Sequence, residues 1–239
     1  MTDPLFRDDA YLRDCTATVV AIDDRGGVVL DRTVFYPTGG GQPGDRGVLE
    51  WAGGETPIAT TAKGEAAGEI VHVPAEGAAL PPVGTEVTAR LDWDIRYRHM
   101  RVHTAMHLLS VVIPLPVTGG SVGADKGRLD FDMPEAPEDK EALERQLNAL
   151  IAGDHVVTSE WITDDELAAN PELVKTMAVK PPMGQGRVRL LRIGAGDGTV
   201  DLQPCGGTHV RATGEIGHVR LGKIEKKGKQ NRRVSILIN

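Results

Sequence analysis

The sequence has few cysteines, few aromatic residues and no long apolar run. Its two cysteines, Cys15 and Cys205, lie far apart in a chain of 239 residues, and aromatic residues make up 4% of it. No apolar stretch approaches the length of a membrane span, and the first residues carry acids where a signal peptide would carry bases. We therefore expect a cytoplasmic protein without a structural disulfide, in which Cys15 is a buried strand residue and Cys205 is available for metal or catalytic chemistry.

Positive charge is also scarce, because the formal net charge is -7. The charge is distributed unevenly: residues 134–144 hold five acids against one lysine, whereas residues 223–233 hold six bases against one acid. A local basic surface can bind phosphate even on an acidic protein. The basic run is interpreted either as such a surface or as a solvated hairpin.

The first 93 residues alternate short β-branched runs with turn residues, without a helical period. Strands are expected in CTATVVAI, GVVL, GEIVHV and TEVTARLDW, with a hairpin at DDRGG between the first two. Several short strands at close spacing are typical of a small barrel or sandwich. We expect residues 1–93 to form one domain.

The hydrophobic period changes at Asp94, where residues 94–113 predict an amphipathic helix that ends before Pro114. A second helix is expected from about Pro137 to Gly153, and Thr163 with Glu166 predicts a capping box for a short third helix. Strands are expected in KGRLDFDM, HVVTSEWI, GRVRLLRI, GTVDLQP, EIGHVRLGKIEK and RRVSILI. Residues 94–239 should therefore form an α+β domain.

Two pairs of possible metal ligands stand out in this second part. His103 and His107 are four residues apart on the predicted helix, which places both imidazoles on one face, and Cys205 and His209 are four apart in the turn CGGTH. The glycines of this turn are expected to let the backbone bend closely. A thiolate with imidazoles favours zinc over magnesium or calcium. Each pair alone could be structural, but together they predict one zinc ion per chain.

The spacing leaves the coordination of this zinc open. If three residues bind the ion and the fourth stands back, a water of lowered pKa could attack a carbonyl. If all four bind, the metal would instead position a substrate or serve only the fold.

Three motifs carry a resemblance to a known family. The segments HTAMHLL and DLQPCGGTHVRATGEIG resemble the editing domain of alanyl-tRNA synthetase, and with TVFYPTGGGQPGDRG the chain resembles the freestanding alanyl-tRNA editing proteins of the AlaX family. The glycine-rich motif marks the longer form. The resemblance implies an N-terminal β-barrel over residues 1–93 and, over 94–239, the two-layer α+β editing domain shared by threonyl- and alanyl-tRNA synthetases.

The resemblance also implies an activity. The protein is expected to act in trans as an ester hydrolase on tRNA(Ala) charged with serine, with glycyl-tRNA as a second candidate substrate. It assigns catalysis to His103, His107, Cys205 and Gln42. Thr118 resembles a threonine that recognises the serine hydroxyl, and Gln42 resembles a glutamine that reaches the active site. From the residues alone, Thr118 is equally well explained as a turn residue, and the glycine-rich loop, which could also bind a phosphate through its backbone amides, is more often a plain turn.

The resemblance also implies tRNA as the binding partner. We expect Arg96, Arg98, Arg101 and the basic segment 223–233 to contact tRNA phosphates, whereas the few aromatic residues show no evident base-stacking platform. A monomer or weak homodimer is expected, with no membrane or protein partner. Two rival interpretations stay open: a non-catalytic zinc-containing tRNA-binding module, and a zinc hydrolase of small esters.

Overall fold

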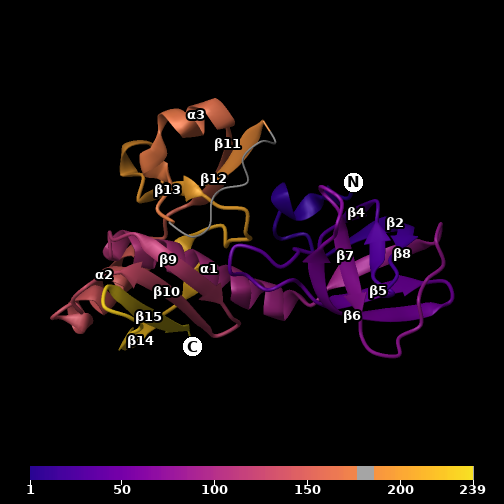
Figure 1. Ribbon diagram of the computed structural model, residues 1–239, viewed down its shortest axis with the longest axis horizontal. Coiled ribbons are helices and arrows are strands. Elements are labelled where there is room, and N and C mark those ends of the chain that lie inside the picture. The colour runs from indigo at the N-terminus through magenta and orange to yellow at the C-terminus, as the bar shows by residue number, and fades with distance from the viewer. Residues whose placement is uncertain (177–185, 239) are drawn as a thin grey trace. The chain divides into compact units, whose positions relative to one another are not determined.

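The computed structural model describes residues 1–176 and 186–238, which fall into two compact units, Met1–Tyr97 and Arg98–Asn239. The division lies inside helix α1 (Trp93–Val112), four residues beyond the boundary expected from the change of hydrophobic period. The architecture is α+β, as predicted (Figure 1). None of the described helices is long and apolar enough to cross a membrane.

The first unit is a closed six-stranded barrel with the strand order β2-β3-β7-β6-β5-β8. Its strands are β2 (Asp14–Ile22), β3 (Val28–Leu30), β5 (Gly47–Trp51), β6 (Gly54–Lys63), β7 (Ile70–Pro74) and β8 (Glu86–Leu91). The barrel is preceded by β1 (Asp3–Pro4) and η1 (Leu5–Arg7), and β1 pairs in parallel with β4 (Arg32–Thr33), which lies between β3 and β5. Side chains such as Leu30, Phe35 and Leu49 fill its interior. The hairpin β5–β6 was not predicted, because its glycine, proline and glutamate residues disrupt the β-branched pattern.

The glycine-rich loop between β4 and β5 is held to the rest of this unit by a buried ion pair. The carboxylate of Asp45 accepts a hydrogen bond from the backbone of Tyr36 and pairs with the guanidinium of Arg96, which is fully buried. Gly40 and Gly41 have φ values of 57° and 83°, a region that side chains rarely adopt. These two glycines are therefore explained by the turn itself.

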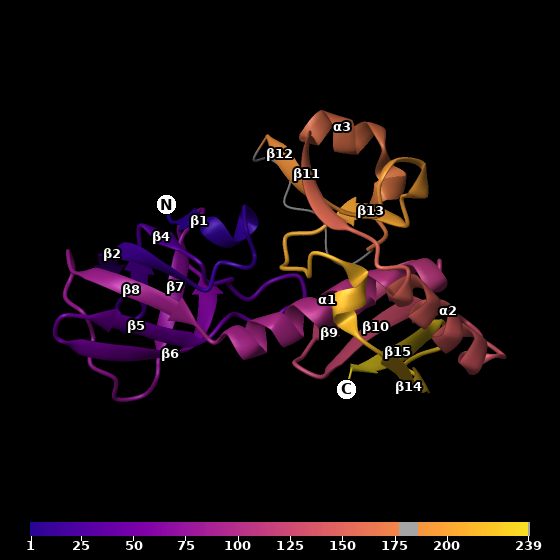
Figure 2. The same ribbon diagram turned by 180° about the vertical axis from the view of Figure 1, so that it is seen from behind.

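The second unit contains two antiparallel sheets, visible from both sides in Figures 1 and 2. The four-stranded sheet has the order β14-β15-β10-β9 and the three-stranded sheet the order β11-β12-β13. The elements are β9 (Val117–Val122), β10 (Lys126–Asp132), α2 (Lys140–Ala152), β11 (Val157–Thr163), α3 (Asp164–Ala169), η2 (Pro171–Leu173), β12 (Arg187–Ile193), η3 (Gly196–Gly198), β13 (Asp201–Pro204), η4 (Thr213–Ile216), β14 (Val219–Lys226) and β15 (Asn231–Ile238).

Most predicted elements of this unit are present. The capping box of Thr163 and Glu166 is confirmed, and Gly153 caps α2 as expected. Helix α2 begins three residues later than predicted because Asp139 is its N-cap, accepting a hydrogen bond from the backbone of Ala142. Strand β9 was not predicted, because its sequence VTGGSV contains two glycines.

Helix α1 has an apolar side and a polar side, but both are buried. Its apolar side packs closely on the four-stranded sheet: a Cβ atom at Gly127 would overlap Val102 and Met106, so glycine is required there. The adjoining side carries histidine, threonine and serine residues that are 8% exposed or less: His99, His103, Thr104, His107 and Ser110. Buried polar groups need partners, so this side of the helix is where a site is expected.

Candidate metal centre

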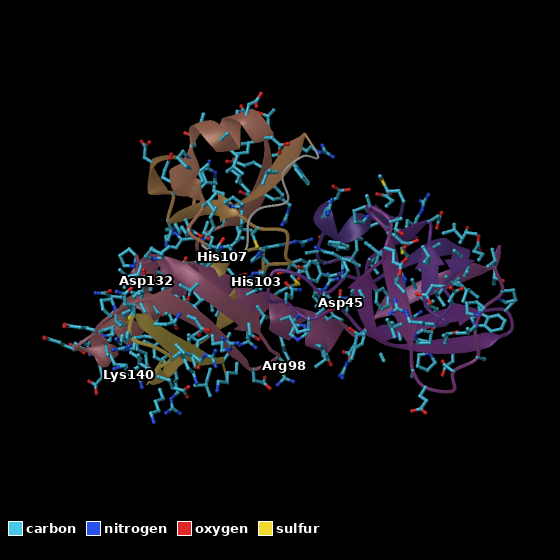
Figure 3. The ribbon with its side chains drawn as sticks, in the orientation of Figure 1. Asp45, Arg98, His103, His107, Asp132 and Lys140 are labelled. Carbon is cyan, nitrogen blue, oxygen red and sulfur yellow. The ribbon has the colours of Figure 1, made fainter. Side chains whose placement is uncertain are left out.

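The two predicted ligand pairs come together in the second unit. His103 and His107 lie one helical turn apart on α1, Cys205 follows β13, and His209 follows four residues later. One ligand atom from each of the four lies within 4.8 Å of the others. The Cys205 Sγ atom is 3.6 Å from His103 Nε2 and 3.2 Å from His209 Nε2. Figure 3 shows His103 and His107 on the side of α1 that faces the three-stranded sheet.

This geometry fits a metal ion. A tetrahedral zinc ion with ligand bonds of about 2.0 to 2.3 Å separates its donor atoms by roughly 3.3 to 3.8 Å, close to the two sulfur–nitrogen distances. The donor set of three imidazoles and one thiolate suits zinc and is unsuited to magnesium or calcium, which prefer oxygen ligands. The donor atom of His209 therefore lies inside the cluster and does not stand back from it.

His107 is oriented by a buried carboxylate. Its Nδ1 atom lies 3.0 Å from Asp201 Oδ2, so Nδ1 carries the proton and Nε2 is left to bind a metal. Asp201 in turn accepts a hydrogen bond from Gln203 Nε2 at 2.7 Å and pairs with the ammonium group of Lys175. Gln203 also contacts Ser110 on α1. The carboxylate is thus fixed from three directions.

His209 is oriented in a similar way by Thr104. The hydroxyl of Thr104 donates to the carbonyl of Met100 at 2.9 Å, so its oxygen accepts from Val210 N–H at 3.3 Å and from His209 Nδ1 at 3.2 Å. Nδ1 of His209 is therefore the protonated nitrogen, and Nε2 faces Cys205. In two of the three histidines, Nδ1 is therefore held in a hydrogen bond, which leaves Nε2 as the atom that would bind a metal.

The charges of the cluster favour a thiolate. Burial works against ionisation of Cys205, but the surrounding histidines, His103 first, outweigh it and lower the pKa of the thiol well below its usual value. Burial also disfavours the charged form of His107, yet the Cys205 thiolate and Asp201 raise its pKa to about 9. Burial and the neighbouring His103 lower the pKa of His209 to about 3. Without a metal, the cluster therefore holds a Cys205 thiolate, a neutral His209 and a protonated His107, and a bound zinc ion would take the place of the proton on Nε2 of His107.

The turn CGGTH is held by Arg189 and reaches the protein surface at Gly206. The guanidinium of Arg189 donates to the carbonyls of Cys205 and Gly207, both at 3.0 Å. Gly206 is exposed, and a Cβ atom there would meet no atom within 4 Å. Gly206 and Gly207 do not have positive φ values, so the turn does not require a backbone conformation that only glycine adopts easily. Cys205 is half-buried and Gly206 is exposed, so the turn reaches the surface at Gly206.

Two other predicted site residues have their own local bonds. Thr118, in β9, donates its hydroxyl to the carbonyl of Asp130 at 3.1 Å and accepts from Asn231 Nδ2 at 2.7 Å. Gln42 belongs to the first unit, where it is buried in the glycine-rich loop and its backbone pairs with Gly39. The contact of either residue with a substrate stays a prediction.

The basic residues expected to contact phosphate differ in their exposure and in their partners within the protein. The prediction is wrong for Arg96, which is fully buried against Asp45. Arg98 pairs with Asp125, and Arg101 donates to the carbonyl of Ile216. In the hairpin β14–β15, Arg233 forms two hydrogen bonds to Asp130, and Lys227 pairs with Glu225 at 2.8 Å. The exposed lysines of this hairpin are Lys223, Lys226, Lys227 and Lys229.

Sequence reasoning missed the groups that support the ligands. Asp201 and Gln203 alternate along β13, and Cys205 continues this alternation one residue beyond its end, where its backbone still pairs with Arg189. Period-two alternation therefore places all three side chains on one face of the sheet. This alternation was visible in DLQPC. Thr104 and Lys175 gave no comparable signal, because each reaches its partner across the fold, 105 and 26 residues away.

Two family models match the chain. The one described as "Threonyl and Alanyl tRNA synthetase second additional domain" covers residues 188–235, and the one described as "tRNA synthetases class II (A)" covers residues 12–95. The first match contains the strands β12 to β14, most of β15 and the turn with Cys205 and His209. The second contains the barrel strands.

Similar proteins extend over nearly the whole chain. The alanyl-tRNA editing protein AlaX-M of Methanosarcina acetivorans is 37% identical over 98% of both chains. AlaX-L of Pyrococcus horikoshii is 35% identical over 96% of this chain and 56% of its own length. The alanine–tRNA ligase of Pyrobaculum neutrophilum is 36% identical over 94% of this chain and 25% of its own length. The chain therefore belongs to the family of alanyl-tRNA editing proteins.

Proposed function

We propose that the protein binds one zinc ion through His103, His107, Cys205 and His209 and hydrolyses the ester of tRNA(Ala) that carries the wrong amino acid. The observation that carries this proposal is the four-donor cluster in which two histidines already present Nε2 inward. Family membership supplies the substrate class, since the matched relatives are named alanyl-tRNA editing proteins. Serine is the proposed wrong amino acid, with glycine second.

Hydrolysis of an aminoacyl ester requires few catalytic groups. An aminoacyl ester is already activated, so its hydrolysis needs a positioned water and stabilisation of the developing oxyanion. Zinc, when bound, would supply the positive charge for these tasks. Residues of the chain position the site: Asp201 and Thr104 orient the imidazoles of His107 and His209, and Arg189 holds the turn that carries Cys205.

Discrimination must act against alanine, which lacks the hydroxyl of serine. A site that forms a hydrogen bond to this hydroxyl rejects its absence strongly, because the polar group of the site would be left without a partner. We propose Thr118 and Gln42 as the residues that contact the substrate. For Thr118, this requires its hydroxyl to exchange one of its present bonds, to Asp130 or Asn231, for the substrate. Because translation supplies the substrate, we also place the protein in the cytoplasm.

Hydrolysis of matched esters tests the proposal. The purified protein is incubated with seryl-tRNA, glycyl-tRNA and alanyl-tRNA, all of alanine identity, and release of each amino acid is followed. We expect rapid release of serine and survival of the alanyl ester. Loss of the seryl ester only at its spontaneous rate would refute hydrolysis, and equal release from the seryl and alanyl esters would refute discrimination.

A structural role for the metal is the second candidate, and the completeness of the four-donor shell favours it. Substitution of Cys205 by Ser separates the two. A catalytic site predicts a folded variant that has lost hydrolysis, whereas a structural site predicts a variant that is unfolded. The fold is measured by circular dichroism on the same preparation.

A further inference from the structure

One exposed aromatic side chain lies on the same sheet as the metal centre. The second unit contains few aromatic residues. One of them, Trp161 in β11, is 39% exposed. The guanidinium of Arg187 lies 4.5 Å from the centre of its ring. An exposed tryptophan with an arginine on its face combines an aromatic surface with a positive charge, the two features that unpaired nucleotides require of a protein.

The strand register connects this tryptophan to the metal ligand. Trp161 is the direct cross-strand partner of Arg189, and the backbone N–H of Cys205 donates to the carbonyl of Arg189 at 3.1 Å. The three residues therefore form one row across β11, β12 and the end of β13. Because neighbouring strands lie about 4.8 Å apart, the backbone of Trp161 is roughly 10 Å from that of Cys205.

Strand alternation places the side chains of this row on the face that forms the site. Residues paired across antiparallel strands point to the same side, so Trp161 and Arg189 share a face with Gln203 and Asp201, which contact α1. Figures 1 and 2 both show α3 on the other side of these strands, away from α1. The face passes from buried Asp201 on β13 to exposed Trp161 on β11.

We propose that Trp161, with Arg187, stacks an unpaired base of the tRNA acceptor end whose aminoacyl ester enters the metal centre. The ester is carried by the last nucleotide of an unpaired 3′ end, so a base must lie near the metal whenever the ester does. Trp161 lies in the same cross-strand row as Cys205, two strands away, and its ring can stack any base because every base has a π face. This inference rests on the proposed function for the identity of the RNA.

A fluorescent base tests the stacking without any hydrolysis. Uncharged tRNA(Ala) is prepared with 2-aminopurine as its 3′-terminal base, and the full-length protein is titrated into it. We expect quenching by the natural protein, retained quenching by Trp161→Phe, and loss of quenching by Trp161→Ala with about 5- to 150-fold weaker binding. The matched control is Thr158→Ala, which alters an exposed residue on the opposite face of the same strand and should change neither signal.

A truncated RNA makes the test specific to the acceptor end. For tRNA that lacks its unpaired 3′ nucleotides, Trp161→Ala and the natural protein should bind equally well. Unchanged quenching and affinity in Trp161→Ala would overturn the proposal, as would an equal loss of affinity for intact and truncated tRNA. Since these measurements use uncharged tRNA, failure to hydrolyse the seryl ester would refute the proposed function without affecting them.

Discussion

The carboxylate of Asp201 lies 3.0 Å from Nδ1 of His107 and is itself held by Lys175 and Gln203. This contact fixes which nitrogen of His107 is available to a metal.

Replacing Asp201 by Asn removes the negative charge while keeping the size of the side chain. We expect about 10- to 100-fold weaker zinc binding, measured by competition with a chromophoric chelator. Asp197→Asn, at an exposed carboxylate in the turn before β13, is the control and should bind zinc normally. Equal affinity of the two variants would contradict a positioning role for Asp201.

Thr104 should support both the fold and the metal site. In Thr104→Val, the N–H groups of His209 and Val210 lose their common acceptor in a buried environment. We expect the free energy of unfolding to fall by about 1 to 3 kcal/mol and zinc binding to weaken. Thr104→Ser keeps the hydroxyl and should recover most of both quantities in urea titrations and chelator competition. A valine variant that matches the serine variant would show that the hydroxyl does not matter.

The ion pair of Arg96 and Asp45 should be costly to break. Both side chains are almost fully buried, and Arg96 also donates to the carbonyls of Ala10 and Val34. Arg96→Met leaves the Asp45 carboxylate without its partner, so we expect a loss of about 3 to 5 kcal/mol in the free energy of unfolding. Adding Asp45→Asn should restore part of that loss by removing the isolated charge. Urea unfolding of the single and double variants measures both, and a loss below about 1 kcal/mol for Arg96→Met would contradict the prediction.

Acid should destabilise the barrel through His72. This side chain is fully buried, contacts Thr33 Oγ1 at 2.7 Å and the carbonyl of Val28 at 3.0 Å, and burial lowers its pKa from 6.5 to about 4. Between these two values the unfolded chain binds a proton that the folded chain does not, so stability falls as the pH decreases from about 6.5 to 4. The contribution of His72 over this range is about 3 kcal/mol.

Comparison with His72→Gln isolates this effect from other titrating groups. The glutamine variant has no imidazole to protonate, so its stability should depend less on pH. We expect the difference in the free energy of unfolding between the natural protein and the variant to shrink as the pH falls from 6.5 to 4. A difference that stays constant over this range would contradict the prediction.

The sequence predicted the elements with strong local patterns and missed those that depend on tertiary pairing. Helix α1 followed from its apolar period, and α3 followed from the capping box of Thr163 and Glu166. Strand β9 contains Gly119 and Gly120 and is a strand because it pairs with β10. The hydrogen-bond partners on the polar side of α1 could not be predicted, because they come from β13 and the turn that follows it.

In the site, too, features with a local sequence pattern were predicted and features that depend on long-range contacts were missed. Four-residue spacing predicted that each pair, His103 with His107 and Cys205 with His209, lies close together, since helix geometry and a short turn fix residues at that distance. The alternation of Asp201, Gln203 and Cys205 was visible in the sequence, but its meaning depended on knowing that β13 faces His107. The partnership of Thr104 with His209 spans 105 residues and has no local pattern. Long-range support of the ligands is therefore the part that required the structure.

Restoration of activity by zinc tests the central claim most directly. The protein is stripped with a chelator, and serine release from seryl-tRNA(Ala) is measured as zinc is returned. We predict that hydrolysis is lost on stripping and recovers fully at one zinc ion per chain, while Cys205→Ser does not recover. Undiminished hydrolysis by the stripped protein, or equal recovery by the Cys205 variant, would contradict the assignment of this activity to the metal centre.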